Sequence, residues 1–445
     1  MLRVLQATAW YPPVHLGGTE VYLTGLVREL RAHDVDSTVI APLAPALADG
    51  YQFDGAIVRC YSVNETPSRA ELRGEIPHHG FSRFSSLLSE EHPNIYHQHS
   101  WSRGLGGAHL HAAREAGLKT VLTIHVPNNF CMRGTMMRFG EHPCDGRIDP
   151  PICGACWSHG RGAPRAIAHM LGAVPSGVAN SIERFSCAAE SRLATALSAR
   201  ALGERRRKEF VRMAADADRL VVVSNWLQEV LLLNGVPQEK VVLSRHGVDH
   251  DFVAAATRVN TLPHDNMDGP FRLVYLGRWD PAKGIDVLVR AVRNTPRAPI
   301  SLSIYGVGDG PDERAYAKTV CRLADGDQRI AIKAPVTRDQ VATTLADADA
   351  LAVPSLCLET GPLVVVEAKA VGVPIIGSRL GGIAELVREP DDGVLVAPGD
   401  VAAWSEAIER MASTRKVASH RSVAAQVRTM RDVADDMAAL YRSLS

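Results

Sequence analysis

The second half of the chain alternates short apolar, β-branched runs with amphipathic stretches. Residues 285–292 place apolar side chains at positions i, i+3, i+4 and i+7, which is the spacing of one helix face. Strands that alternate with helices form βαβ units and a parallel sheet, and ligands bind beyond the carboxyl ends of such strands. The strands expected here are residues 272–277, 301–306, 329–334, 350–355, 374–378 and 393–397.

The first half repeats this α/β pattern with two interruptions. Residues 126–160 form an insertion rich in cysteine, proline and glycine. Residues 164–217 are rich in alanine and arginine, which predicts one or two long helices. The strands expected in this half are residues 2–7, 37–41, 57–61, 94–98, 120–124, 220–223 and 241–243.

A polar stretch punctuated by proline and glycine, residues 253–271, predicts a linker between two domains. We therefore expect an N-terminal domain at residues 1–255 and a C-terminal domain at residues 256–424, both of the Rossmann-like α/β class. A last helix at about residues 425–445 is expected to pack back on the N-terminal domain.

The composition is that of a soluble globular protein, with 46% apolar and 22% charged residues in a chain of 445. Lysine plus arginine and aspartate plus glutamate both number 49, so the basic excess of a nucleic-acid-binding protein is missing. No uninterrupted apolar run reaches the roughly 18 residues that span a bilayer, and the first residues lack a signal-peptide pattern. We expect a cytoplasmic protein with reduced cysteines.

Two cations, Arg278 and Lys283, occupy the loop that follows the expected strand at residues 272–277. Cations at the end of a strand and before a helix can neutralise a diphosphate leaving group. An ordinary surface loop is the alternative, and it explains a single lysine better than this pair.

Two acids, Glu359 and Glu367, bracket a Gly-Pro step and an apolar run. Pro362 suits the first turn of a helix, and Gly372 suits the position past its end. Carboxylates are strong acceptors for hydroxyl groups, so we expect Glu359 to bind a donor sugar and Glu367 to bind a ribose. Either acid alone is also consistent with a solvated helix residue.

Glycines mark two other loops at strand ends. Gly17 and Gly18 precede a helix, where backbone N–H groups and the helix dipole favour a phosphate. Gly306 and Gly308 follow another expected strand and are predicted to line the nucleotide. Ordinary tight turns are the alternative in both places, because a lone glycine-rich turn is a weak signal.

The chain resembles the retaining nucleotide-sugar glycosyltransferases of family four in five segments, residues 17–30, 277–292, 305–314, 354–387 and 392–400. The resemblance covers nearly the whole chain apart from the insertion, and the spacing of Glu359 and Glu367 is its most specific feature. It implies the GT-B fold, in which two Rossmann-like domains face each other across a cleft.

This resemblance implies a role for each matching residue. The implied catalytic residues are His125, Arg278, Lys283 and Glu359. The implied donor-binding residues are Gly17, Gly18, Gly306, Gly308, Gly361, Pro362, Leu363, Val364 and Glu367. His97 and His99 match a strand-end motif, although core histidines explain them nearly as well, and His246 replaces an asparagine frequent in the family.

The implied activity is transfer of a sugar from a nucleotide-diphosphate sugar to a hydroxyl acceptor, with retention of anomeric configuration. Charge stabilisation by protein groups can replace a divalent metal, so no catalytic cofactor is expected. The expected acceptor is a cell-surface glycan or a lipid-linked oligosaccharide, and no nucleic acid is expected as a partner. A sugar-nucleotide epimerase and a non-catalytic binding protein of the same fold are the alternatives. The glutamate motif lacks the family's common Gly-Phe-Gly centre, so the donor sugar and base stay unassigned.

Four cysteines of the insertion form a candidate metal site: Cys131, Cys144, Cys153 and Cys156. The two-residue spacing of the last two suits a tetrahedral ion, and four thiolates predict a closed, structural zinc site. Free thiols, a disulfide and an iron–sulfur cluster are the alternatives.

Five basic residues in the expected helical segment form a candidate contact with anionic lipid: Arg200, Arg205, Arg206, Arg207 and Lys208. A solvated helix face is the alternative. On the first interpretation the protein associates peripherally with the inner face of a membrane.

Overall fold

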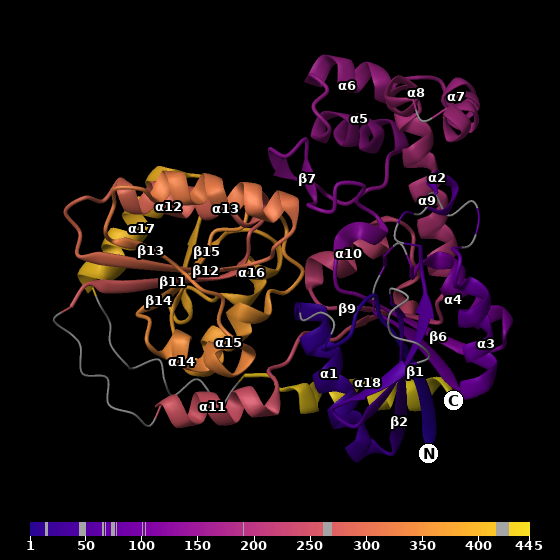
Figure 1. Ribbon diagram of the computed structural model, residues 1–445, viewed down its shortest axis with the longest axis horizontal. Helices are drawn as coiled ribbons and strands as arrows, with labels where there is room; N and C mark the ends of the chain where they lie inside the picture. Colours follow the sequence, from indigo (N-terminus) through magenta and orange to yellow (C-terminus); the bar gives the residue numbers. More distant parts are fainter. Residues whose placement is uncertain are drawn as a thin grey trace. The chain divides into compact units, whose positions relative to one another are not determined.

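The computed structural model describes the chain except for residues 14–16, 44–49, 65, 67, 73–75, 77, 100, 103, 190, 261–268 and 415–426. The chain forms two compact units (Figure 1). The first unit comprises Met1–Arg245 and Arg431–Ser445, and the second comprises His246–Met430. In the parts of the chain that are described, no helix is long and apolar enough to cross a membrane.

The boundary between the units lies after Arg245, not after residue 255. Much of the expected linker is instead a helix, α11 (His250–Asn260), which packs on two other helices of the second unit, α14 (Val341–Ala346) and α15 (Leu363–Val371). Phe252 and Ala256 of α11 are buried in this contact, so apolar burial assigns the helix to the second unit.

An eight-stranded sheet forms the centre of the first unit, in the order β10-β9-β6-β5-β1-β2-β4-β3. All neighbours are parallel except β3 and β4, which are antiparallel at one edge. The strands are β1 (Leu2–Ala7), β2 (Val35–Leu43), β3 (Gly50–Phe53), β4 (Ala56–Ser62), β5 (Ile95–Gln98), β6 (Lys119–Ile124), β9 (Arg219–Val222) and β10 (Val241–Leu243). The helices around it are α1 (Gly18–Leu30), α2 (Arg69–Leu72), α3 (Phe81–Glu91), α4 (Gly107–Glu115), α10 (Asn225–Leu233) and α18 (Met430–Leu444).

Residues 126–217 leave this sheet and form what we call the helical extension of the first unit. It begins with the two-stranded sheet of β7 (Met137–Arg138) and β8 (His142–Pro143). Its helices are α5 (Pro150–Gly160), α6 (Arg165–Gly172), α7 (Ser176–Ala189), α8 (Arg192–Leu197) and α9 (Ala199–Asp216). Within the first unit, α6, α7 and α8 lie at the end away from β1 and β2 (Figure 1).

The prediction of one or two long helices at residues 164–217 is therefore wrong. Pro164 and Pro175 directly precede α6 and α7, and proline is accommodated at a helix start but not in its interior. Ser191 starts α8, because its side chain accepts a hydrogen bond from the Ala194 N–H. These local signals divide the segment into four helices.

A six-stranded parallel sheet forms the second unit, in the order β13-β12-β11-β14-β15-β16. Its strands are β11 (Phe271–Arg278), β12 (Ile300–Val307), β13 (Ile330–Lys333), β14 (Ala350–Val353), β15 (Ile375–Ser378) and β16 (Gly393–Val396). The remaining helices are η4 (Pro281–Lys283), α12 (Ile285–Arg293), α13 (Pro311–Ala324), η5 (Arg338–Gln340), α16 (Gly381–Leu386) and α17 (Val401–Thr414). Each strand expected in this half is present within one or two residues of its expected bounds.

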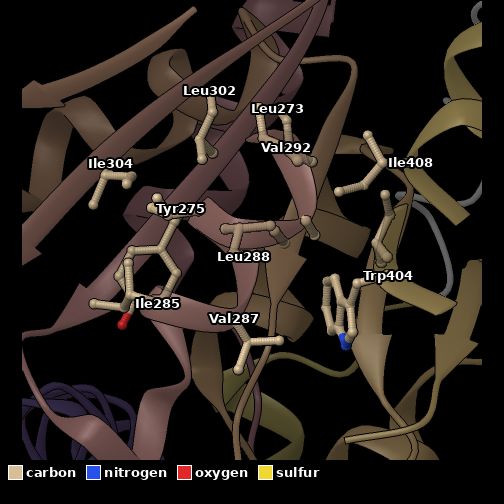
Figure 2. Close-up of a cluster of buried hydrophobic side chains, with 14 of the residues drawn as sticks. Leu273, Tyr275, Ile285, Val287, Leu288, Val292, Leu302, Ile304, Trp404 and Ile408 are labelled. Carbon is tan, nitrogen blue, oxygen red and sulfur yellow. The ribbon is translucent and has the colours of Figure 1, made fainter. Parts of the chain in front are cut away.

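The apolar face of α12 packs into the core of the second unit, as its periodicity predicts. Ile285, Leu288 and Val292 are fully buried, together with Leu302 of β12 and Trp404 of α17 (Figure 2). Each such side chain contributes roughly 1.5–3 kcal/mol by leaving water. This packing holds α12, and with it the loop after β11, against the sheet.

Candidate functional site

The loops after β11 and β14 meet because these two strands are neighbours in the sheet. Lys283 Nζ donates to Glu359 Oε1 at 2.5 Å, and Ser355 Oγ donates to the same oxygen at 2.7 Å. The Leu356 N–H donates to the Ala282 carbonyl oxygen at 2.7 Å and joins the two loops directly. The structure therefore brings together the cation predicted to bind a diphosphate and the acid predicted to bind a sugar.

Lys283 and Glu359 are largely buried, and each holds the other in its charged form. Burial by itself lowers the pKa of Lys283, but the Glu359 carboxylate outweighs burial and raises this pKa above its usual value. Burial by itself raises the pKa of Glu359, but the Lys283 ammonium outweighs it and lowers this pKa. The pair is ionic at neutral pH, and its two charges neutralise each other.

Arg278 is the accessible cation of this group. Its side chain is 64% exposed at the end of β11, where one guanidinium nitrogen lies 3.7 Å from Asp280 Oδ2. An ion pair this exposed contributes little to stability. Arg278 is thus placed to meet an anion from solvent, whereas Lys283 is already engaged by Glu359.

Glu367 is buried on α15, where Arg338 forms an ion pair with it. The Arg338 guanidinium carbon also lies 5.0 Å from the centre of the Phe252 ring, which is cation–π geometry. The sequence analysis missed Arg338. Its position just beyond β13 was the available signal, because Arg278 was identified by the same relation to β11.

The segment that leads into α15 is held by His246. The His246 Nδ1–H donates to the Gly361 carbonyl oxygen at 2.8 Å, and burial lowers the pKa of this histidine to about 4. Pro362 is the N-cap residue, Leu363 and Val364 open the helix half-buried, and Gly372 ends it with a φ of 78°. His246, whose role the sequence left open, therefore positions the backbone ahead of α15.

Two of the predicted ligand glycines, Gly306 and Gly308, have local structural reasons. A side chain at Gly306 would meet the Trp279 ring at 2.0 Å, and Gly308 has a φ of +114° beside Glu313. Gly17 precedes α1 and donates its N–H to Glu20 Oε2 at 2.8 Å, while Gly18 is the first residue of that helix. Packing and backbone geometry account for Gly306 and Gly308 in the absence of any ligand.

Buried polar side chains gather at the carboxyl ends of β1, β5 and β6 in the first unit. His125 directly follows β6, and its Nε2 lies 3.3 Å from His99 Nδ1. His99 Nε2 lies 2.8 Å from Gln6 Oε1, and Gln6 Nε2 donates to Tyr441 Oη at 3.2 Å. Tyr441 Oη also lies 2.5 Å from His97 Nδ1. The C-terminal helix α18 thereby contacts His97 directly and is linked to His99 through Gln6.

These contacts determine which nitrogens carry protons. Burial lowers the pKa values of His97 and His99 far below the usual histidine value, so both rings are neutral at pH 7. Gln6 Oε1 can only accept, so His99 carries its proton on Nε2 and accepts at Nδ1. His125 must then donate from Nε2 to His99 Nδ1. The strand-end histidines are thus a connected network, and not isolated core residues.

The four insertion cysteines have different surroundings. The Phe139 N–H donates to Cys156 Sγ at 3.1 Å, whereas Cys153 interacts electrostatically with Cys144 and Cys131, and burial raises the pKa of Cys153 to about 12. Across the described ranges, no three histidine, cysteine, aspartate or glutamate side chains are arranged to hold a metal ion. The four-thiolate zinc site stays a prediction.

Ion pairs occupy much of the predicted basic patch on α9. The pairs are Arg200–Glu204, Arg205–Glu183 and Arg206–Glu209. Arg207 and Lys208 are exposed. Because three of the five cations are paired with acids, this patch is less positive than its sequence suggests.

Comparisons with known proteins match both units. A family model described as "Glycosyl transferase 4-like domain" matches residues 17–247, and one described as "Glycosyl transferases group 1" matches residues 270–414. The D-inositol 3-phosphate glycosyltransferase of Mycolicibacterium smegmatis is 30% identical over 234 residues, which make up 51% of this chain and 51% of that protein. The chain spans about half the length of the curated relatives it matches.

Solved structures resemble the chain over its whole length. Sucrose-phosphate synthase of Thermosynechococcus elongatus has a TM-score of 0.68 at 19% identity, covering 100% of this chain and 99% of that one. HepE of Anabaena in complex with UDP-glucose has a TM-score of 0.64 at 16% identity, covering 100% of both chains. At these identities the likeness concerns the fold, and it confirms the predicted class of two α/β domains with parallel sheets.

Proposed function

The chain belongs to the glycosyl transferase 4-like family with the GT-B fold, and from this premise we propose that it transfers a sugar from a nucleotide-diphosphate sugar to a hydroxyl group. The observation that carries the proposal is the grouping of Arg278, Lys283 and Glu359 beyond β11 and β14. Cations suit a diphosphate, and a carboxylate suits sugar hydroxyls. The UDP-glucose bound to HepE supports a donor of this class.

In this proposal the donor lies across the carboxyl ends of the strands in the second unit. Arg278 binds the diphosphate first, because it is exposed, and Lys283 then shares its charge between the diphosphate and Glu359. Glu359 accepts hydrogen bonds from the sugar hydroxyls, and Glu367 accepts them from the ribose hydroxyls. The Arg338 side chain shifts so that the Glu367 carboxylate can bind the ribose as well. The backbone N–H groups that open α15 favour the phosphate charge through the helix dipole.

The transfer step follows from stabilisation of the leaving group. Arg278 and Lys283 neutralise the negative charge that develops on the departing diphosphate, so a divalent metal is not required. The acceptor hydroxyl attacks the anomeric carbon from the face that the diphosphate leaves and passes its proton to the departing phosphate oxygen. This retains anomeric configuration without a protein nucleophile.

For the acceptor we propose a cell-surface glycan or a lipid-linked oligosaccharide. The family membership supports sugar transfer, and two relatives carry the names "D-inositol 3-phosphate glycosyltransferase" and "Amylovoran biosynthesis glycosyltransferase AmsK". A cytoplasmic protein that meets a membrane surface fits such an acceptor.

A panel of UDP-, GDP- and ADP-sugars tests the proposal. Donor binding should raise the melting temperature of the whole protein by mass action. Nucleotide release should then be measured with and without mixed glycan acceptors, alongside Lys283→Ala and, as a matched control, Lys318→Ala on the exposed face of α13. Release that depends on an acceptor and is lost only in Lys283→Ala supports transfer. Conversion of the donor sugar without nucleotide release would indicate an epimerase. If none of the nucleotide sugars binds, the protein has a different function.

A further inference from the structure

Large apolar side chains are exposed on the helical extension to an unusual degree. Met170 of α6 is 72% exposed and Leu193 of α8 is 70% exposed, more than any other large apolar side chain except Met1 in the described part of the chain. Ile167 of α6 and Val178 of α7 are about half exposed. Single exposed apolar residues are common on protein surfaces, whereas several on one part of the molecule mark an interaction site. Helix α7 packs against α8, and α6 and α7 both pack against α9.

The amphipathic pattern of α6 is inverted. Its buried residues are the small ones, Ala168 and Gly172, whereas Ile167 and Met170 are exposed. A side chain at Gly172 would meet the Pro151 carbonyl oxygen at 2.2 Å, so α6 packs on α5 through close backbone contact. A surface helix normally buries its large apolar residues. Here Ile167 and Met170 face solvent, whereas Leu171 is half-buried.

The segment that carries these side chains has a positive net charge. Residues 150–203 contain five arginines and two glutamates. One of these glutamates, Glu183, is buried and paired with Arg205 of α9. Arg161, Arg184 and Arg192 are exposed beside the apolar residues in the sequence. An apolar surface with a cationic border suits a lipid layer with anionic head groups.

We propose that α6, α7 and α8 form a surface that docks on an anionic phospholipid bilayer. We call it the tip surface, and it comprises Ile167, Met170, Val178, Leu193, Arg161, Arg184 and Arg192. The apolar side chains enter the boundary between head groups and acyl chains, and the arginines bind head-group phosphates. A second copy of this chain is a poor occupant, because two cationic borders would repel each other. The tip surface differs from the basic patch on α9, and docking does not require the proposed transferase activity.

Vesicle flotation with the full chain tests the proposal. Binding should be compared between phosphatidylcholine vesicles and equal mixtures of phosphatidylcholine and phosphatidylglycerol. We expect binding to the anionic vesicles only, weakened about tenfold or more in Met170→Ser/Leu193→Ser and in Ile167→Ser/Val178→Ser. The matched control is Leu232→Ser/Leu233→Ser on α10, which removes two exposed apolar side chains elsewhere and should bind normally.

Two further arms complete the experiment. Arg184→Gln/Arg192→Gln should bind anionic vesicles more weakly while its melting temperature stays unchanged, because both side chains are exposed. Equal binding to neutral and anionic vesicles, or undiminished binding of both apolar variants, would overturn the proposal. So would a lipid-free dimer in sedimentation velocity that Met170→Ser/Leu193→Ser dissociates, since the tip surface would then join two copies.

Discussion

Lys283 and Glu359 form a largely buried ion pair, although 76 positions separate them in the chain. Each was expected to meet a different part of a ligand, the lysine a diphosphate and the acid a sugar. The pairing keeps two opposite charges at the ends of β11 and β14 without a ligand. A donor that carries both an anion and hydroxyl groups can engage the two partners at once.

Loss of either donor-side cation should slow the proposed reaction. We expect Arg278→Ala and Lys283→Ala each to lower kcat/KM by more than tenfold, or more than about 1.4 kcal/mol of transition-state stabilisation, because each removes charge that balances the leaving diphosphate. Steady-state kinetics with the identified donor measure this, with Lys318→Ala as the control. Near-normal kinetics in the Arg278/Lys283 double variant would falsify the proposed role of both.

The Lys283–Glu359 pair should also make the free energy of unfolding depend on pH. The folded pKa of Glu359 is lowered, so its contribution is present above its unfolded pKa of about 4.3 and is lost as pH falls through the folded value. The folded pKa of Lys283 is raised, so its contribution is complete below its unfolded pKa of about 10.4 and is lost as pH rises through the folded value.

We therefore expect Glu359→Gln to cost on the order of 3 kcal/mol of unfolding free energy at pH 7, because a buried ammonium loses its partner. The difference between wild type and variant should shrink as pH falls below about 4. Urea unfolding at pH 7 and at several pH values below about 4 measures this difference. A difference that stays constant with pH would show that the pair is not the cause.

Substitutions of Glu367 and Glu359 should affect different kinetic parameters, KM for the first and kcat for the second. We expect Glu367→Ala to raise KM with little change in kcat, because a ribose contact is equally strong in the ground and transition states. Glu359→Ala should mainly lower kcat. Arg338→Ala should behave like Glu367→Ala, since it leaves the Glu367 carboxylate without its ion pair. A drop in kcat at constant KM for Arg338→Ala would contradict the assignment.

Removing the Tyr441 hydroxyl of α18 should destabilise the network of Gln6, His97, His99 and His125. Tyr441→Phe removes the hydroxyl that joins Gln6 to His97, and we expect it to cost about 1–3 kcal/mol, because buried polar groups lose their partner. Nitrogen chemical shifts of the histidine rings should show that His125 keeps its Nε2 proton in wild type and loses this preference in Gln6→Leu. Unchanged ring shifts in Gln6→Leu would exclude the network as the determinant.

Most strands could be located from the sequence, because apolar periodicity and turn residues act over a few neighbouring positions. The same logic identified the loops beyond β11 and β14, since parallel strands place their carboxyl ends at one edge of the sheet. Periodicity did not predict helix boundaries that a single residue determines. Pro175 and Ser191 interrupt the long helix expected before α9, and α11 was mistaken for a linker because its burial depends on the second unit.

Which side chains meet was decided by the tertiary structure alone. Arg338 and Glu367 pair across 29 positions, and Tyr441 reaches His97 across 344. Such contacts depend on strand order and on where each helix returns to the sheet, which no local pattern encodes. The exposure of Met170 was equally hidden, because an apolar residue at helical spacing ordinarily predicts a buried face. Sequence determined the kinds of chemistry available, and the packing of the elements determined which groups are paired, buried or exposed to solvent.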